Sequence, residues 1–150
     1  MALVKNGQIA IDRRTVDIRA VKQCLAVLAS GGVVGIYPEG ARGRGDVART
    51  RGGAAYLALV SGAPVVPVAC LGTRPDGAAT SAMPGRGVRL DTVFGAPLMF
   101  EQQPWPRTKA RVGAVQAEIQ AALATHVQAA CDLTGQRLPS MPAADAGADR

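Results

Sequence analysis

The sequence predicts an α/β domain built on a mostly parallel sheet flanked by helices. Strand-like and helix-like segments alternate along the first half of the chain, and two of the strand-like segments, residues 33–37 and 65–71, have no polar face. Strands of this kind are typical of a sheet covered on both sides, and alternation with helices is typical of right-handed crossovers between parallel strands.

The chain is predicted to begin with a short strand and a helix. Residues 8–12 place Ile9 and Ile11 between less apolar neighbours, which indicates a strand. A helix follows, capped by Thr15 or Asp17 and ended by two glycines at residues 31–32. Its apolar stripe consists of Ile18, Val21, Leu25 and Leu28.

The second half of the chain is predicted to add two helices and two strands. A glycine- and arginine-rich loop at 40–53 leads into a helix over about 53–61, and the strand at 65–71 is interrupted by Pro67, which indicates an edge, a bulge or a bend. A loop over 72–87 precedes a strand at 88–94. The clearest helix runs from about 108 to 133, with an apolar stripe of Val112, Val115, Ile119, Leu123 and Val127.

Composition limits the classes of protein to consider. A chain of 150 residues with 48% hydrophobic side chains is most simply one domain, and its net charge of +6 favours an anionic partner or serves general solubility. The three cysteines match no metal framework and are expected to be reduced and buried. The sequence shows neither a signal peptide nor an apolar run long enough to span a bilayer.

Charged residues at the predicted strand ends are the candidate site. Glu39 and Arg42 flank a glycine turn after the 33–37 strand, where they could grip an anion or form an ion pair that ties down the turn. Arg13 ends the preceding strand, and strand ends of a parallel sheet gather at one ligand-binding edge. The arginines between residues 44 and 51 could form a lid over a phosphate or a flexible basic loop.

Several common chemistries find no support. The chain has no P-loop, no GxGxxG and no nucleophile-elbow serine, and it lacks the interleaved aromatic residues of an RNA-binding surface. His126 is the only histidine; it lies on the edge of the last helix's apolar stripe, and we interpret it as a structural residue. We therefore expect no metal site and no cofactor.

Three motifs, in order, resemble the glycerolipid acyltransferases of the 1-acylglycerol-3-phosphate acyltransferase type. Gly7-x-Ile9-x-Ile11-Asp12-Arg13 looks like that family's second block, Tyr37-Pro38-Glu39-Gly40-Ala41-Arg42-Gly43 is similar to its Phe-Pro-Glu-Gly-Thr-Arg-Ser block, and Val65-Val66-Pro67-Val68-Ala69 resembles its fourth block. The resemblance covers about residues 7–74, and Arg51 stands where the family often has a lysine before a helix. It implies that Arg13, Glu39, Gly40, Arg42 and Arg51 bind the acceptor's glycerol phosphate and that Pro67 shapes the acyl site.

The resemblance breaks at the family's first block, His-x-x-x-x-Asp, whose histidine is the general base that takes the proton of the acceptor's hydroxyl. That block belongs upstream of Gly7, and residues 1–6 contain no histidine. Ala41 and Gly43 also replace two hydroxyl side chains of the family. Three explanations remain open: a start placed too late in the gene, an N-terminally truncated gene, or a non-catalytic relative. An in-frame His-x-x-x-x-Asp in the upstream DNA would support the first.

The resemblance implies transfer of an acyl group from acyl-CoA or acyl carrier protein to lysophosphatidic acid, in a cytoplasmic protein peripheral to the inner face of a membrane. We expect residues 1–134 to form an acyltransferase-like domain that lacks the family's N-terminal elements, with no catalytic residue and a disordered tail at 135–150. Apolar surface left uncovered predicts poor solubility, self-association or membrane binding. The alternative is a non-catalytic anionic-lipid or phosphate binder. A nucleic-acid-binding protein is a third hypothesis, which we disfavour.

Overall fold

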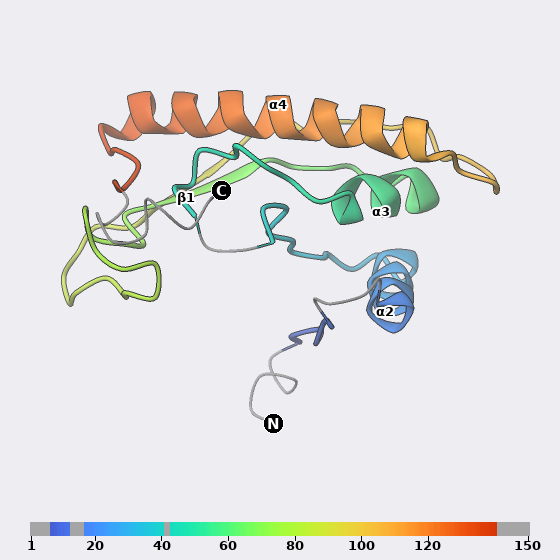
Figure 1. The fold of residues 1–150 in the computed structure, drawn as a ribbon, viewed down its shortest axis with the longest axis horizontal. Coiled ribbons are helices and arrows are strands. Elements are labelled where there is room, and N and C mark those ends of the chain that lie inside the picture. The colour runs from blue at the N-terminus through green and yellow to red at the C-terminus, as the bar shows by residue number, and fades with distance from the viewer. Residues whose placement is uncertain (1–6, 13–16, 41–42, 141–150) are drawn as a thin grey trace.

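A long C-terminal helix forms one side of the molecule, and a shorter helix and a strand pack directly against it. The computed structural model describes residues 7–12, 17–40 and 43–140. Helix α4 (Lys109–Thr134) runs the length of the structure, with α3 (Gly53–Ser61) and strand β1 (Val68–Leu71) packed beneath it and α2 (Ile18–Ala29) packed on α3 (Figure 1). Strand β2 (Asp91–Phe94) completes the elements of the described residues.

The helices begin and end where local sequence signals predict. Asp17 caps α2, with its carboxylate accepting a hydrogen bond from the Ala20 N–H at 3.0 Å, while the alternative cap, Thr15, lies outside the described residues. Thr108 caps α4 by accepting from the Arg111 N–H at 3.1 Å. Gly62 and Gly135 end α3 and α4 in the left-handed conformation, which glycine adopts without strain.

The core consists of two clusters that α4 joins. The first packs α3 against the N-terminal half of α4, and the second packs β1 against its C-terminal half. Their buried members are Ala55, Ala58, Leu59, Phe100, Val115 and Ile119 in the first, and Val47, Ala69, Leu71, Val127, Ala130 and Cys131 in the second. The predicted apolar stripe of α4 is confirmed, because Val115, Ile119 and Val127 are all buried.

The α/β class agrees with the structure, but the predicted parallel sheet is wrong. The sheet of the described residues has two strands, and β1 pairs antiparallel with β2 in the register Val68 to Phe94 and Leu71 to Asp91. Pro67 lies just before β1, where its carbonyl accepts a hydrogen bond from the Gly95 N–H at 2.8 Å. This place fits proline, because the ladder there requires no donor from residue 67.

The two N-terminal strands that the sequence predicted are also absent. Residues 8–12 and 33–37 form no strand with any other described segment. Residues 33–36 make no backbone hydrogen bond to any other described residue, and Val33 and Tyr37 are 91% and 85% exposed. An apolar run forms a buried strand only when a partner strand lies beside it, and no described strand does so here.

Candidate functional site

The predicted Glu39 turn is present although the strand before it is not. The Gly40 N–H donates to the Tyr37 carbonyl at 3.1 Å, and Gly40 has a φ of +70°, so residues 37–40 form a tight turn that glycine closes without strain. The turn directs the Glu39 side chain toward the residue 43–47 segment, where a Cβ added at Gly43 would lie 3.9 Å from the Glu39 carboxylate.

The Glu39 side chain is half-buried. Burial raises its pKa, the Val47 N–H that donates to it lowers the pKa, and the nearby Asp46 raises it further. Among the described residues, no cation forms an ion pair with Glu39. A carboxylate that is partly desolvated and held by a backbone donor is arranged to accept hydrogen bonds from a hydroxyl-bearing ligand.

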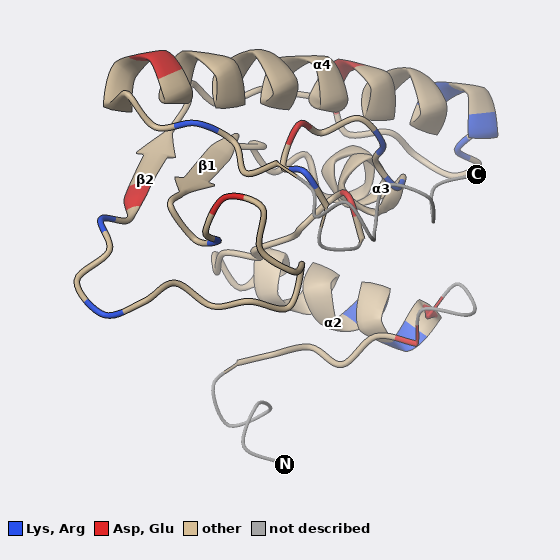
Figure 2. Ribbon diagram, turned by 60° about the vertical axis from the view of Figure 1, so that its left-hand side comes forward, with Lys and Arg blue, Asp and Glu red and all other residues tan. Residues whose placement is uncertain are grey.

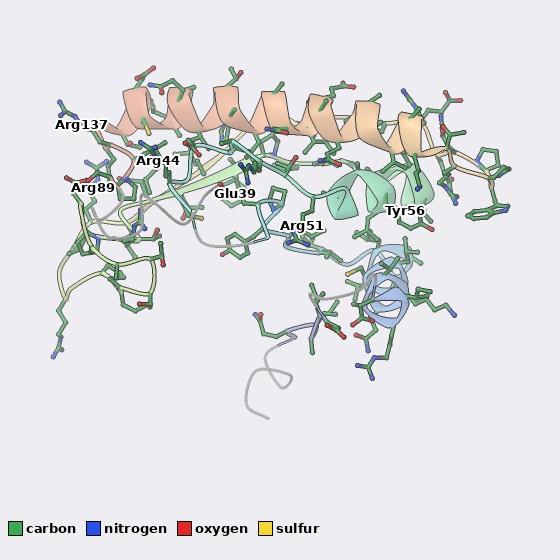
Figure 3. The ribbon with its side chains drawn as sticks, in the orientation of Figure 1. Glu39, Arg44, Arg51, Tyr56, Arg89 and Arg137 are labelled. Atoms are coloured by element: carbon green, nitrogen blue, oxygen red, sulfur yellow. The ribbon has the colours of Figure 1, made fainter. Side chains whose placement is uncertain are left out.

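Arg51 is fixed against the same turn. Its N–H donates to the Pro38 carbonyl at 2.8 Å, and its side chain crosses Gly40 so closely that a Cβ there would lie 2.6 Å from Arg51 Nε. Glu39 and Arg51 are both labelled beneath the middle of α4 (Figure 3). The pair places an acceptor carboxylate and a guanidinium at one turn, which suits a ligand that carries both hydroxyl groups and an anion.

Val47 is a strained residue beside this turn. It is only 3% exposed and has a φ of +57°, a left-handed conformation that is unusual for a β-branched residue. Its carbonyl accepts from Gln120 Nε2 at 3.0 Å, and the Ala48 carbonyl accepts from the same nitrogen at 2.9 Å. Strain of this kind persists where the surroundings fix it, and here Gln120 and the core hold Val47 so that its N–H meets Glu39.

The polar face of α4 therefore supports the site. The sequence did not lead us to expect this role for α4. Besides Gln120, Gln116 donates through Nε2 to the Thr50 carbonyl at 2.7 Å. The signal was present in the sequence as two glutamines four residues apart beside the apolar stripe of α4. Such a pair can reach one neighbouring segment, since residues i and i+4 lie on the same helix face.

Pro67 lies in a different part of the molecule. It is buried and lines an apolar groove of about 600 Å³ between α4 and the segment after β2, together with Leu98, Ala122, His126 and Ala129. An α-helix turns about 100° per residue. Ala122 therefore lies on roughly the opposite side of α4 from Gln120, and the groove does not adjoin the Glu39 turn.

His126 has a structural partner at this groove. Its Nε2 lies 3.0 Å from the Val93 carbonyl of β2, and a Cβ at Gly95 would lie 2.9 Å from Nδ1. The chain's one histidine thus fastens α4 to the sheet, on the side of α4 that faces away from Glu39.

The structure brings Glu39, Gly40 and Arg51 together and leaves Pro67 apart. Arg13 and Arg42 lie outside the described residues, so their predicted roles stay predictions. The predicted tail also lies outside them beyond residue 140, while Ser140 itself donates to the Asp76 carboxylate at 2.7 Å. Arg44 Nε lies 3.9 Å from Asp46 Oδ2. Whether residues 44–51 form a lid over a phosphate or a flexible basic loop stays open.

Comparison with known proteins gives one match. Residues 2–71 match the family model described as Acyltransferase, and this segment holds Glu39, Gly40, Arg51 and Pro67. The match supports the acyltransferase family and a general acyltransferase function for the part of the chain that ends with β1. Neither the curated proteins nor the solved structures gave a match.

Two further properties of the described residues bear on function. None of their helices is long and apolar enough to cross a membrane. They also contain no group of three metal-ligating side chains placed to hold an ion.

Proposed function

We propose that this chain binds a lysophospholipid as the acceptor of an acyl transfer from acyl-CoA or acyl carrier protein. The observation that carries the proposal is the Arg51 side chain lying across Gly40 beside the half-buried Glu39 carboxylate. Arg51 would bind the phosphate of 1-acylglycerol 3-phosphate with Arg13 and Arg42, and Glu39 would accept from a glycerol hydroxyl.

In the reaction that this acceptor undergoes, its hydroxyl oxygen attacks the thioester carbonyl carbon, the carbon–sulfur bond breaks, and the thiol leaves with a proton. A base must take the hydroxyl proton during the attack. His126, the chain's only histidine, is bonded to the Val93 carbonyl on another side of α4. We therefore propose that these 150 residues bind the acceptor and turn it over slowly or not at all.

We propose that the apolar groove at Pro67 binds an acyl chain. Its lining is mostly alanine, leucine and proline, which an unbranched hydrocarbon could cover, while Glu118, Thr125 and His126 add polar groups to it. In this proposal the protein works at the inner face of a membrane, into which the lysophospholipid acceptor partitions.

Titration calorimetry with a short-chain lysophosphatidic acid below its micelle concentration tests acceptor binding. We expect Arg51→Gln to weaken binding about tenfold, the loss expected for a charge-assisted hydrogen bond. Arg86→Gln, which removes the same charge from an exposed loop, is the matched control. Equal affinities for the wild type and Arg51→Gln would contradict the proposal.

A non-catalytic binder is the second candidate function, and the position of His126 favours it. An acyl-transfer assay separates the two candidates, because a binder shows acceptor affinity without thiol release. Where slow turnover is seen, we expect His126→Ala to leave it unchanged. Turnover abolished by His126→Ala would show that the histidine acts as the base after all.

A further inference from the structure

The segment that leads into α4 presents the chain's only tryptophan to solvent. Trp105 is 78% exposed, and Pro104 and Pro106 on either side of it are also exposed. A large apolar ring held outside the core is an uncommon arrangement that calls for a partner. This segment lies at one end of the molecule, beyond the N-terminal end of α4 (Figure 1).

Both ends of this segment are fixed to the fold. On one side, Phe100 is buried in the core and the Gln103 N–H donates to the Leu59 carbonyl at 2.8 Å. On the other, Thr108 caps α4. The two prolines further restrict the backbone between these anchors. Trp105 is therefore presented by a short segment with little freedom to fold back.

Two cations follow the tryptophan along the chain, on different sides of the first turn of α4. Lys109 and Arg111 are exposed in the first turn of α4, which has no acidic residue, and no ion pair engages either of them within the described part of the chain. Figure 2 shows this end of α4 in the colour of Lys and Arg. The N-terminus is the positive end of the helix dipole, so cationic side chains there are repelled by it. This arrangement lowers the stability of α4 unless an anion lies nearby.

Arg107 lies behind these cations and packs on the fold. Its guanidinium carbon lies 5.9 Å from the Tyr56 ring centroid, and its Nε is buried without a hydrogen-bond partner. Tyr56 is labelled below the N-terminal half of α4 in Figure 3. We call the surface formed by Trp105, Lys109 and Arg111 the Trp105 tip.

We propose that the Trp105 tip docks end-on on an anionic lipid bilayer, with the indole in the headgroup region and the exposed side chains of Lys109 and Arg111 on lipid phosphates. Tryptophan is enriched at membrane interfaces because one end of its ring is polar and the rest is apolar. Basic side chains beside it match the negative surface of anionic lipids. A single aromatic residue does not provide the successive stacking platforms that single-stranded nucleic acid uses.

The inference rests on the proposed function for its lipid setting, and it adds the surface that meets the membrane. That surface lies outside residues 2–71, the part that matches the acyltransferase family. Acceptor binding at Arg51 and docking at Trp105 involve separate residues and separate measurements.

Trp105 provides its own probe, because its fluorescence is the tryptophan signal of the whole chain. The full chain is titrated with vesicles of phosphatidylcholine alone or of equal parts phosphatidylcholine and phosphatidylglycerol. We expect the emission to shift to shorter wavelength only with the anionic vesicles, to return on addition of salt, and to be quenched by lipids brominated near the headgroup.

Co-sedimentation with the same vesicles measures the variants. We expect Lys109→Ala and Arg111→Ala each to weaken partitioning about fivefold, the loss expected for one cation near an anionic surface. We expect Trp105→Ala to weaken it by about tenfold or more. The matched controls are Arg86→Ala and Met83→Ala on the exposed loop after β1, at the other end of the molecule, and both should bind as the wild type does.

Three outcomes would overturn the docking surface: sedimentation with anionic vesicles without a change in Trp105 emission, equal binding to both kinds of vesicle, or an emission change with a single-stranded oligonucleotide but not with vesicles. A chain that binds short-chain lysophosphatidic acid but no vesicles would overturn this inference alone. A chain that docks through Trp105 but ignores lysophosphatidic acid would overturn the proposed function and leave the docking surface in place.

Discussion

The side chain of Arg51 lies directly over the backbone of Gly40. A Cβ at Gly40 would lie 2.6 Å from Arg51 Nε and 2.8 Å from Arg51 Cδ, closer than nonbonded atoms approach one another. The Arg51 N–H also donates to the Pro38 carbonyl, two residues before Gly40. The missing side chain at residue 40 is therefore what lets the guanidinium lie across the turn that carries Glu39.

Replacing Gly40 by alanine should disturb both the fold and the site. The left-handed φ of +70° costs a residue with a side chain about 1–2 kcal/mol, and the new methyl group would displace Arg51. We expect a loss of unfolding free energy of that size in urea, together with weaker calorimetric binding of lysophosphatidic acid.

Gly113→Ala is the matched control for Gly40→Ala. Gly113 lies inside α4 with nothing within 4 Å of the position of a Cβ, so alanine should stabilise the helix by about 0.5–1 kcal/mol. An equal stability of Gly40→Ala and the wild type would show that the turn relaxes without strain.

Glu39 should make stability depend on pH in a specific direction. Burial raises the pKa of its carboxyl above the ordinary value of 4.5, so just above pH 4.5 the folded chain binds more protons at this site than the unfolded chain. Its contribution to stability is therefore greatest below pH 4.5 and is lost as pH rises through the raised pKa. The unfolding free energy of wild type relative to Glu39→Gln, measured by urea titration from pH 4 to 7, should fall across that window. A difference that rises with pH would contradict the burial of this carboxylate.

Gln120 should be needed to hold the Val47 segment. Removing its amide leaves the carbonyls of Val47 and Ala48 without this donor, and Thr50 Oγ1 loses its acceptor at 3.1 Å. We expect Gln120→Ala to lower the unfolding free energy by about 1–3 kcal/mol, as for a buried polar group that loses its partner. Hydrogen exchange at the Val47 amide should also become faster.

Gln128 offers a matched control on the same helix. It is exposed, and its side chain donates to the Asp132 carboxylate four residues on, so Gln128→Ala should change stability by about 0.5 kcal/mol or less. If Gln120→Ala lowers the unfolding free energy as little as Gln128→Ala does, water replaces the Gln120 amide at the Val47 and Ala48 carbonyls.

The helices could be predicted from sequence because their signals are local. Asp17, Gly62 and Gly135 act within a turn of the helix that each one caps, whereas strand pairing depends on residues far apart in the chain. The apolar residues 33–37 fitted a central strand, yet nothing in them specifies a neighbour. The Glu39 turn was predictable from its glycine. The hydrogen bond from Gln120 to the Val47 carbonyl was not, because it joins residues that are 73 positions apart in the chain.

The exposed segment at 33–37 should make the chain associate with itself in concentrated solution. Its apolar side chains are largely exposed, and residues 33–36 make no backbone hydrogen bond to any other described residue. Residues 23–38 carry no charged side chain to oppose strand pairing between two copies. We expect light scattering after size exclusion to show a mass that rises with protein concentration. Val33→Lys should reduce this rise, because a lysine on a strand edge opposes pairing. Val88→Lys, which adds the same charge to an exposed loop, should not. A mass that stays constant with concentration, or one that both variants reduce equally, would show that residues 33–37 do not pair.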